Sequence, residues 1–137
     1  MENKKETVLF LCTHNSARSQ IAEGLLNTIY ADKYVGFSAG VEKTHVNPYA
    51  VEVMKEIGID LSKHYSKNVE EFKDDNFDYV VTVCDNAKET CPFFPGKNVI
   101  HKGFEDPAST DGSIEEILHA FRKTRDEIKD WMKENFG

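Results

Sequence analysis

The sequence lacks any long hydrophobic run. Its first apolar stretch, residues 8–11, is far shorter than the roughly 20 residues of a membrane-spanning helix or the roughly 7 to 15 of a signal-peptide core. Positive charge is also in short supply, since 24 acidic residues outnumber 17 basic ones and leave a net charge of −7. Nucleic acids and anionic membranes bind clustered positive charge, so neither is an expected partner. We expect a cytoplasmic protein. Because its net charge repels anions, any anionic ligand must be bound by a local cluster of groups that attract it.

Cysteine is scarce as well. Three cysteines, an odd number in a chain expected in a reducing compartment, argue against a disulfide framework and for free or redox-active thiols. The five histidines are not spaced with them as metal ligands, so no metal site is predicted. Repeats, low-complexity tracts and linkers are absent too. A chain of 137 residues fits one domain, which we expect to span Met1–Gly137.

Hydrophobic patterning predicts strands that alternate with helices. A short continuous apolar run predicts a buried strand at residues 7–11, and further strands are predicted at residues 34–38, 77–83 and 99–100. Between and after them, apolar residues recur at helical spacing. One of these helices begins at an Asn47-Pro48 cap, and the last begins at a capping box of Ser113 and Glu116. The alternation predicts an α/β fold, a three-layer sandwich with a central four-stranded parallel sheet.

Residues 12–19, which follow the first predicted strand, have the form Cys, five residues, Arg, Ser before a helix. The carboxyl ends of parallel strands are where such sheets bind ligands. The backbone N–H groups of such a turn and the positive helix N-terminus form a cradle for a tetrahedral anion, and Arg18 adds a bidentate clamp. The same field favours the thiolate of Cys12 as a nucleophile. The predicted oxyanion-binding residues are Thr13, His14, Asn15, Ser16, Ala17, Arg18 and Ser19. The alternative is a buried strand-end thiol beside a surface arginine.

A second cysteine, Cys84, ends the strongest predicted strand, and Cys91 follows seven positions later. Residues 85–90 begin with a helix-capping residue, and a short helix here spans about 10 Å. A disulfide requires Cα atoms within about 7 Å. The two cysteines can therefore pair only if the segment unwinds, and we predict a helix in the reduced form and a loop in the oxidised form. Taken singly, Cys84 is also explained as a buried strand residue and Cys91 as a spare thiol.

An acidic loop after the last predicted strand supplies a candidate general acid. The carboxyl group of Asp106, in Asp106-Pro107, can protonate a leaving oxygen if it reaches the anion loop. Glu105 competes for this role, and Asp-Pro is also an ordinary turn signal.

Together these motifs resemble the thioredoxin-coupled arsenate reductases along nearly the whole chain. The resemblance is carried by residues 12–24, Ser38-Ala39-Gly40, Asn47-Pro48, residues 81–84, Cys91-Pro92 and residues 103–108. That family shares the fold of the low-molecular-weight protein tyrosine phosphatases, which also have the Cys–five–Arg–Ser loop and an Asp-Pro acid. The pair Cys84 and Cys91 distinguishes the reductases from the phosphatases, because it resembles the cysteine arrangement of the reductases.

The resemblance implies a reaction and a partner. Arsenate would bind in the loop, and Cys12 would attack arsenic while Asp106 protonates the departing oxygen. Cys84 would then attack Cys12 and release arsenite, and Cys91 would move the disulfide to Cys84–Cys91 for reduction by thioredoxin or a similar dithiol protein. Catalysis would thus rest on Cys12, Cys84, Cys91, Arg18 and Asp106. The implied enzyme is a monomer without a tightly bound cofactor.

Two positions depart from the family pattern. His14 stands where the family often has glycine. Some relatives bind a potassium ion near the loop through residues that match Asn15, Glu23 and Ser38 together with an acid, and Lys67 occupies the position of that acid. A lysine there repels a cation, so potassium binding is not expected.

Two other functions compete with the reductase. A phosphatase acting on phosphotyrosine or a small phosphomonoester would need Cys12, Arg18 and Asp106 but would leave Cys84 and Cys91 without a role. A redox-responsive, non-enzymatic module would use the cysteine pair as a sensor and would leave the oxyanion loop unexplained.

Overall fold

The structure, a computed structural model, describes residues 4–85 and 93–137. Its strands are Glu6–Cys12 (β1), Tyr34–Gly40 (β2), Tyr79–Thr82 (β3) and Asn98–His101 (β4). Its α-helices are Arg18–Ile29 (α1), Pro48–Lys55 (α2) and Ile114–Phe136 (α3), and two short 3-10 helices are Val69–Phe72 (η1) and Pro107–Ser109 (η2). The predicted alternation of strands and helices is confirmed.

The four strands form one parallel sheet in the order β2-β1-β3-β4. Cys12 at the end of β1 lies opposite Gly40 of β2, and Leu11 lies opposite Thr82 of β3. The ladder continues past β3, because the backbone N–H of Val83 donates to the carbonyl of Leu11 at 2.8 Å. The register therefore brings the ends of β1, β2 and β3 to one edge of the sheet, as the sequence predicted.

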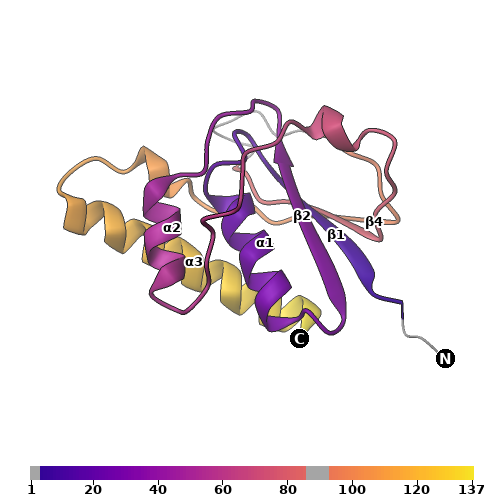
Figure 1. Cartoon of the computed structure of the whole chain (residues 1–137). Coiled ribbons are helices and arrows are strands. Elements are labelled where there is room, and N and C mark those ends of the chain that lie inside the picture. Colours follow the sequence, from indigo (N-terminus) through magenta and orange to yellow (C-terminus); the bar gives the residue numbers. More distant parts are fainter. Residues whose placement is uncertain (1–3, 86–92) are drawn as a thin grey trace.

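All three α-helices lie on one side of this sheet (Figure 1). The larger hydrophobic core lies between them and the sheet. It includes Val8 and Phe10 from β1, Leu25 from α1, and Phe121 and Ile128 from α3, all fully buried. The burial of these apolar stripes, rather than helix propensity, is what holds the long helix α3 in place.

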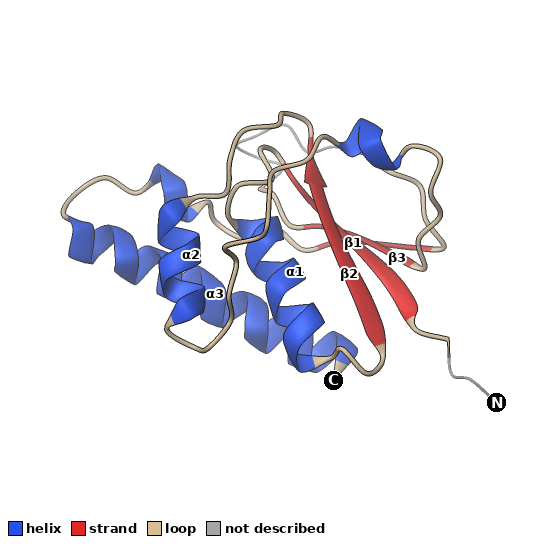
Figure 2. Ribbon diagram, in the orientation of Figure 1, coloured by secondary structure: helices blue, strands red, loops and turns tan. Residues whose placement is uncertain are grey.

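The opposite face carries a thinner layer, with η1 on that side (Figure 2). A smaller cluster there includes Leu9, Leu11 and Phe77, against which Phe72 of η1 and Phe37 of β2 pack. Edge-to-face contacts, with ring centroids 5.5 to 6.0 Å apart, join Phe37, Phe72 and Phe77. The predicted sheet covered on both faces is confirmed, but in the described residues a 3-10 helix and loops form the second cover.

Helix starts follow their local signals. The side chain of Asn47 accepts the N–H of Tyr49 at the start of α2, and Ser113 and Glu116 form the predicted capping box of α3. The helix predicted at residues 85–90 falls almost entirely outside the described residues, and Cys91 falls outside them as well. Within the described ranges, no helix combines the length and apolar character needed to cross a membrane.

Candidate active site

The nucleophile candidate, Cys12, is the last residue of β1 and is a free thiol with 2% of its surface exposed. Its Sγ lies 2.8 Å from the hydroxyl oxygen of Ser19, in the first turn of α1. That hydroxyl already accepts a hydrogen bond of 2.7 Å from the Nδ2 of Asn15. Either atom can be the donor when Cys12 is a thiol, and when Cys12 is ionised the O–H of Ser19 donates to the sulfur and stabilises the thiolate.

The loop between β1 and α1 is held in an uncommon backbone conformation at Asn15, whose φ is +50°. Gln20 donates to the backbone oxygen of Asn15 at 3.1 Å and to its side-chain oxygen at 2.9 Å. The backbone N–H of Lys67 donates to the same side-chain oxygen at 2.8 Å. Several independent hydrogen bonds thus fix the loop, which is how such conformations persist at functional sites.

Helix α1 begins at Arg18, and among the described residues no side chain caps its N-terminus. The N-cap residue is Ala17, which has no side-chain acceptor. The first N–H groups of a helix lack intrahelical partners and carry partial positive charge. An uncapped helix start beside a free thiol is suited to an external anion.

Arg18 connects this loop to the segment that follows β4. The guanidinium group is 3% exposed, and its Nη1 donates to the backbone oxygen of Phe104 at 3.1 Å. Its Nη2 lies 3.7 Å from a carboxylate oxygen of Asp106. These contacts orient the guanidinium group and bring the acidic loop to the mouth of the anion loop.

A pocket of about 220 Å³ lies at this junction. Its lining residues are Cys12, His14, Ser16, Ala17, Arg18, Thr44, His45, Asp106 and Ala108. The structure therefore brings together the predicted thiol, arginine and acid. Glu105, the competing acid, does not line this pocket. The side chains of Asn15 and Ser19 are fully buried behind the loop and act by holding it.

Asp106 has 32% of its side chain exposed and also caps η2, since its Oδ1 accepts the N–H of Ala108 at 3.0 Å. The cap fixes the orientation of the carboxyl group. Its second oxygen, Oδ2, is the one that faces Arg18.

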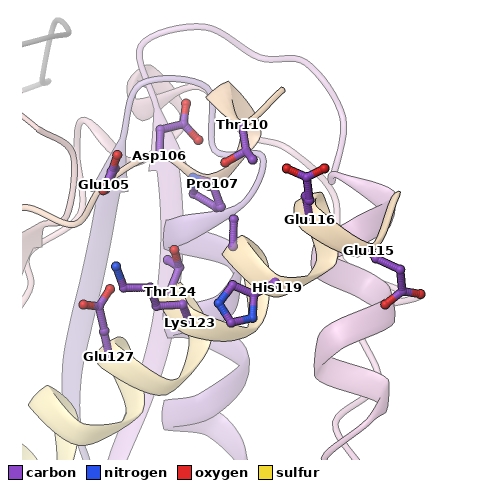
Figure 3. Close-up of a pocket in the computed structure, with 11 residues that line it drawn as sticks. Glu105, Asp106, Pro107, Thr110, Glu115, Glu116, His119, Lys123, Thr124 and Glu127 are labelled. Carbon is purple, nitrogen blue, oxygen red and sulfur yellow. The ribbon is translucent and has the colours of Figure 1, made fainter. Parts of the chain in front are cut away.

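A larger pocket of about 510 Å³ lies on the other side of Asp106, between η2 and α3 (Figure 3). Its charged and titratable lining residues are Glu105, Asp106, Glu115, Glu116, His119, Lys123 and Glu127. Five carboxylates against one lysine repel an anion. The smaller pocket, which has a buried guanidinium group and a helix N-terminus, is the one suited to an oxyanion.

Cys84 follows β3 and is fully buried. It belongs to the same hydrophobic cluster as Cys12, at adjacent strand ends. Cys84 is disulfide-bonded, whereas Cys12 is a free thiol. The position of the predicted third cysteine, Cys91, lies outside the described residues.

Gln20 and Gly40 belong to the site but were not predicted as parts of it. Gln20 is fully buried and bonded to the loop, and its signal was a polar residue on the apolar face of a helix. Gly40, predicted only as a turn, touches the loop backbone so closely that a Cβ there would lie 2.7 Å from the oxygen of Thr13. His14 takes no left-handed conformation, so glycine is not required at its position.

Comparison with known proteins agrees with this geometry. A sheet that ends in a Cys–five–Arg–Ser loop defines the class of the low molecular weight phosphotyrosine protein phosphatases, and the model of that family matches residues 7–136. An arsenate reductase of Halalkalibacterium halodurans is 46% identical over 125 residues, which is 90% of each chain. The chain therefore belongs to this family and, within it, to the arsenate reductases.

Solved structures agree. A structure described as an arsenate reductase in the phosphate binding state superposes with a TM-score of 0.79 at 31% identity, covering 94% of this chain and 95% of the other. A thioredoxin-dependent arsenate reductase of Corynebacterium glutamicum superposes with a TM-score of 0.65 at 27% identity. That match covers 98% of this chain and 63% of the other.

Proposed function

We propose that this protein reduces arsenate to arsenite in the cytoplasm, as a monomer, with electrons from thioredoxin or a similar dithiol protein. The observation that carries the proposal is the pocket in which the free thiol of Cys12, the guanidinium group of Arg18 and the carboxyl group of Asp106 converge. All three come from one chain, so this part of the site needs no second subunit. A relay of thiols requires a reducing compartment, which supports the cytoplasmic location.

The loop binds the oxyanion and aligns it with the thiolate. Arg18 and the N-terminus of α1 neutralise the negative charge of arsenate, a local capture that a chain of net charge −7 requires. The Cys12 thiolate then forms an S–As bond, and one As–O bond breaks. Asp106 protonates the departing oxygen, which leaves as water.

The relay then transfers two electrons. The thiolate of Cys84 attacks the sulfur of Cys12, the S–As bond breaks, and its electron pair stays on arsenic as arsenite. A Cys12–Cys84 disulfide remains. Cys91 attacks Cys84 and frees Cys12.

The Cys84–Cys91 disulfide that ends the proposed relay determines what kind of electron donor is needed. Thioredoxin-type dithiols reduce accessible disulfides by thiol exchange. The relative from Corynebacterium glutamicum is named as thioredoxin-dependent, which supports the same kind of donor here. No tightly bound cofactor enters this scheme, because the three cysteines hold the electrons themselves.

A steady-state assay tests the proposal, with arsenate, thioredoxin, thioredoxin reductase and NADPH in one cuvette and an aryl phosphate in a second. The wild type is expected to oxidise NADPH only when arsenate is present. Cys12→Ser should lose both activities. Cys91→Ser should keep any aryl phosphate hydrolysis while losing multiple turnover with arsenate, so it is its own folding control. Aryl phosphate hydrolysis without arsenate-dependent NADPH oxidation would assign the chain to the phosphatases instead.

A further inference from the structure

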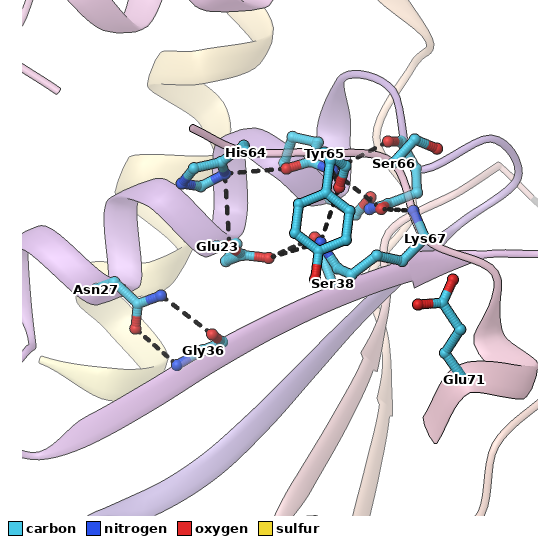
Figure 4. A network of polar contacts seen from close by, with 12 residues as sticks. Glu23, Asn27, Gly36, Ser38, His64, Tyr65, Ser66, Lys67 and Glu71 are labelled. Atoms are coloured by element: carbon cyan, nitrogen blue, oxygen red, sulfur yellow. Dashed lines mark hydrogen bonds and ion pairs between the residues drawn. The ribbon is translucent and has the colours of Figure 1, made fainter. Parts of the chain in front are cut away.

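Lys67 lies in the loop before η1 and is only 7% exposed, which is unusual for a lysine. Its Nζ donates to the backbone oxygen of Tyr65 at 2.9 Å and lies 4.6 Å from the centre of the Tyr65 ring. The same ammonium group lies 3.7 Å from a carboxylate oxygen of Glu23. Figure 4 shows this lysine reaching across to the helix that carries Glu23.

Glu23 is a carboxylate on α1 with 14% of its side chain exposed. The hydroxyl of Ser38 donates to its Oε1 at 2.5 Å, and the Nδ1 of His64 lies 3.4 Å from its Oε2. A carboxylate taken out of water is costly unless a cation and hydrogen bonds compensate it. Lys67 supplies that cation from within the chain.

The backbone of Lys67 is fixed to the anion loop and to the strand beside it. Its N–H donates to the side chain of Asn15 at 2.8 Å, and its carbonyl accepts the N–H of Gly40 at 2.9 Å. Asn15 in turn donates to Ser19, which contacts the nucleophilic sulfur. One residue thus connects α1, β2 and the strained centre of the loop.

The residues present do not fit a potassium ion. Asn15, Glu23 and Ser38, which the family resemblance matches to potassium ligands, hold suitable oxygens. The fourth matching position is Lys67, whose ammonium group already lies beside the carboxylate of Glu23. A potassium ion bound by Glu23 would lie next to this ammonium group, and two neighbouring cations repel each other strongly.

We infer that the ammonium group of Lys67 is a built-in monovalent cation that positions the oxyanion loop, so that this protein does not require potassium. The inference rests on the proposed oxyanion role of the loop. Lys67 is a positioning residue, since it touches neither the thiol nor the pocket and acts through Asn15 and Glu23.

The test compares wild type, Lys67→Asp and Lys67→Met in potassium chloride and in tetramethylammonium chloride at equal ionic strength. Lys63→Asp is the matched control, because Lys63 is an exposed lysine near the same loop and carries the same charge change. Phosphate affinity is measured by calorimetry, and the melting temperature of the ligand-free protein is measured alongside. The melting temperature does not depend on reductase activity, so it separates failure of this inference from failure of the proposed function.

Wild type and Lys63→Asp are expected to show the same phosphate affinity and melting temperature in both salts. Lys67→Asp should bind phosphate roughly 10- to 100-fold more weakly in tetramethylammonium chloride, because the loop loses its fixed geometry. Potassium should restore most of that loss, since the new carboxylate completes a cation site. Lys67→Met, which has neither the ammonium group nor a new carboxylate, should also bind phosphate more weakly than wild type in tetramethylammonium chloride.

Potassium-specific stabilisation of the wild type would overturn the inference. So would unchanged phosphate affinity in Lys67→Met, which removes the ammonium group while keeping most of the length of the side chain. If Lys67→Asp does not fold, the wild type and Lys67→Met measurements still decide the matter.

Discussion

Gly40→Ala is expected to displace the anion loop from behind. A Cβ at this position would lie 2.7 Å from the oxygen of Thr13, 2.8 Å from the nitrogen of Asn15 and 2.8 Å from the oxygen of Cys12. All three are backbone atoms of the loop, so no side chain can rotate out of the way. Ordinary contact begins near 3.4 Å, and the loop must therefore move by about 0.6 to 0.7 Å.

The magnitude follows from that displacement. Misplacing a reacting group by about 1 Å costs roughly a hundredfold in rate, so a shift of this size should weaken phosphate affinity and kcat/KM by roughly tenfold. Overpacking of a tight core costs about 1 to 3 kcal/mol, which lowers the melting temperature of a domain of this size by about 3 to 12 °C.

Gly36→Ala is the matched control, since it makes the same change in the same strand. A Cβ there would meet the tip of the Leu26 side chain at 3.0 Å and the Asn27 side chain at 3.4 Å, far from the loop. We expect wild-type phosphate affinity for this variant in isothermal titration calorimetry. If Gly40→Ala binds phosphate as tightly as Gly36→Ala, the close approach of β2 does not shape the anion site, and the reasoning is refuted.

Three further substitutions test other parts of the account. Arg18→Lys should weaken phosphate binding by about 1.5 to 3 kcal/mol, roughly 10- to 150-fold in Kd by calorimetry, because a point charge replaces a fork; wild-type affinity would contradict this. Asp106→Asn should lower kcat roughly 100-fold with little change in KM in stopped-flow assays, since the amide cannot give up a proton; an unchanged kcat would remove Asp106 from the mechanism. Hydrogen bonding from Arg122, and secondarily from Arg125, lowers the pKa of Glu56 in the folded protein below its ordinary value of 4.5. The ion pair therefore stabilises the fold above pH 4.5, and this stabilisation is lost as the pH falls through the pKa of Glu56 in the folded protein. Glu56→Gln should therefore melt below wild type at pH 7, with a difference that shrinks as the pH falls below 4.5, and a difference that stays constant on acidification would contradict the ion pair.

The features that the sequence predicted well are those with local signals. The apolar run before Cys12, the cap at Asn47 and the capping box at Ser113 each depend on a few neighbouring residues, and each is found in the structure. Strand β3 spans Tyr79–Thr82 and is shorter than the predicted segment, residues 77–83, because only these four residues pair with both β1 and β4.

The features that the sequence could not give depend on segments that are far apart in the chain. The resemblance singled out Lys67, but its contact with Glu23 exists only once folding brings the two together, and Gly40 looks like a turn until β2 pairs with β1. Gln20 joins two such segments, since its amide group also donates to the backbone oxygen of Tyr65 at 3.0 Å. Such contacts follow from tertiary packing, for which no short pattern exists.

The most direct test of the central claim is disulfide mapping by mass spectrometry after one equivalent of arsenate is added to reduced Cys91→Ser protein. The relay predicts one arsenite per chain and a Cys12–Cys84 disulfide in nearly every molecule, with no further turnover when thioredoxin is the only reductant. Arsenite formation with Cys84 still reduced, or repeated turnover by this variant with thioredoxin, would contradict it.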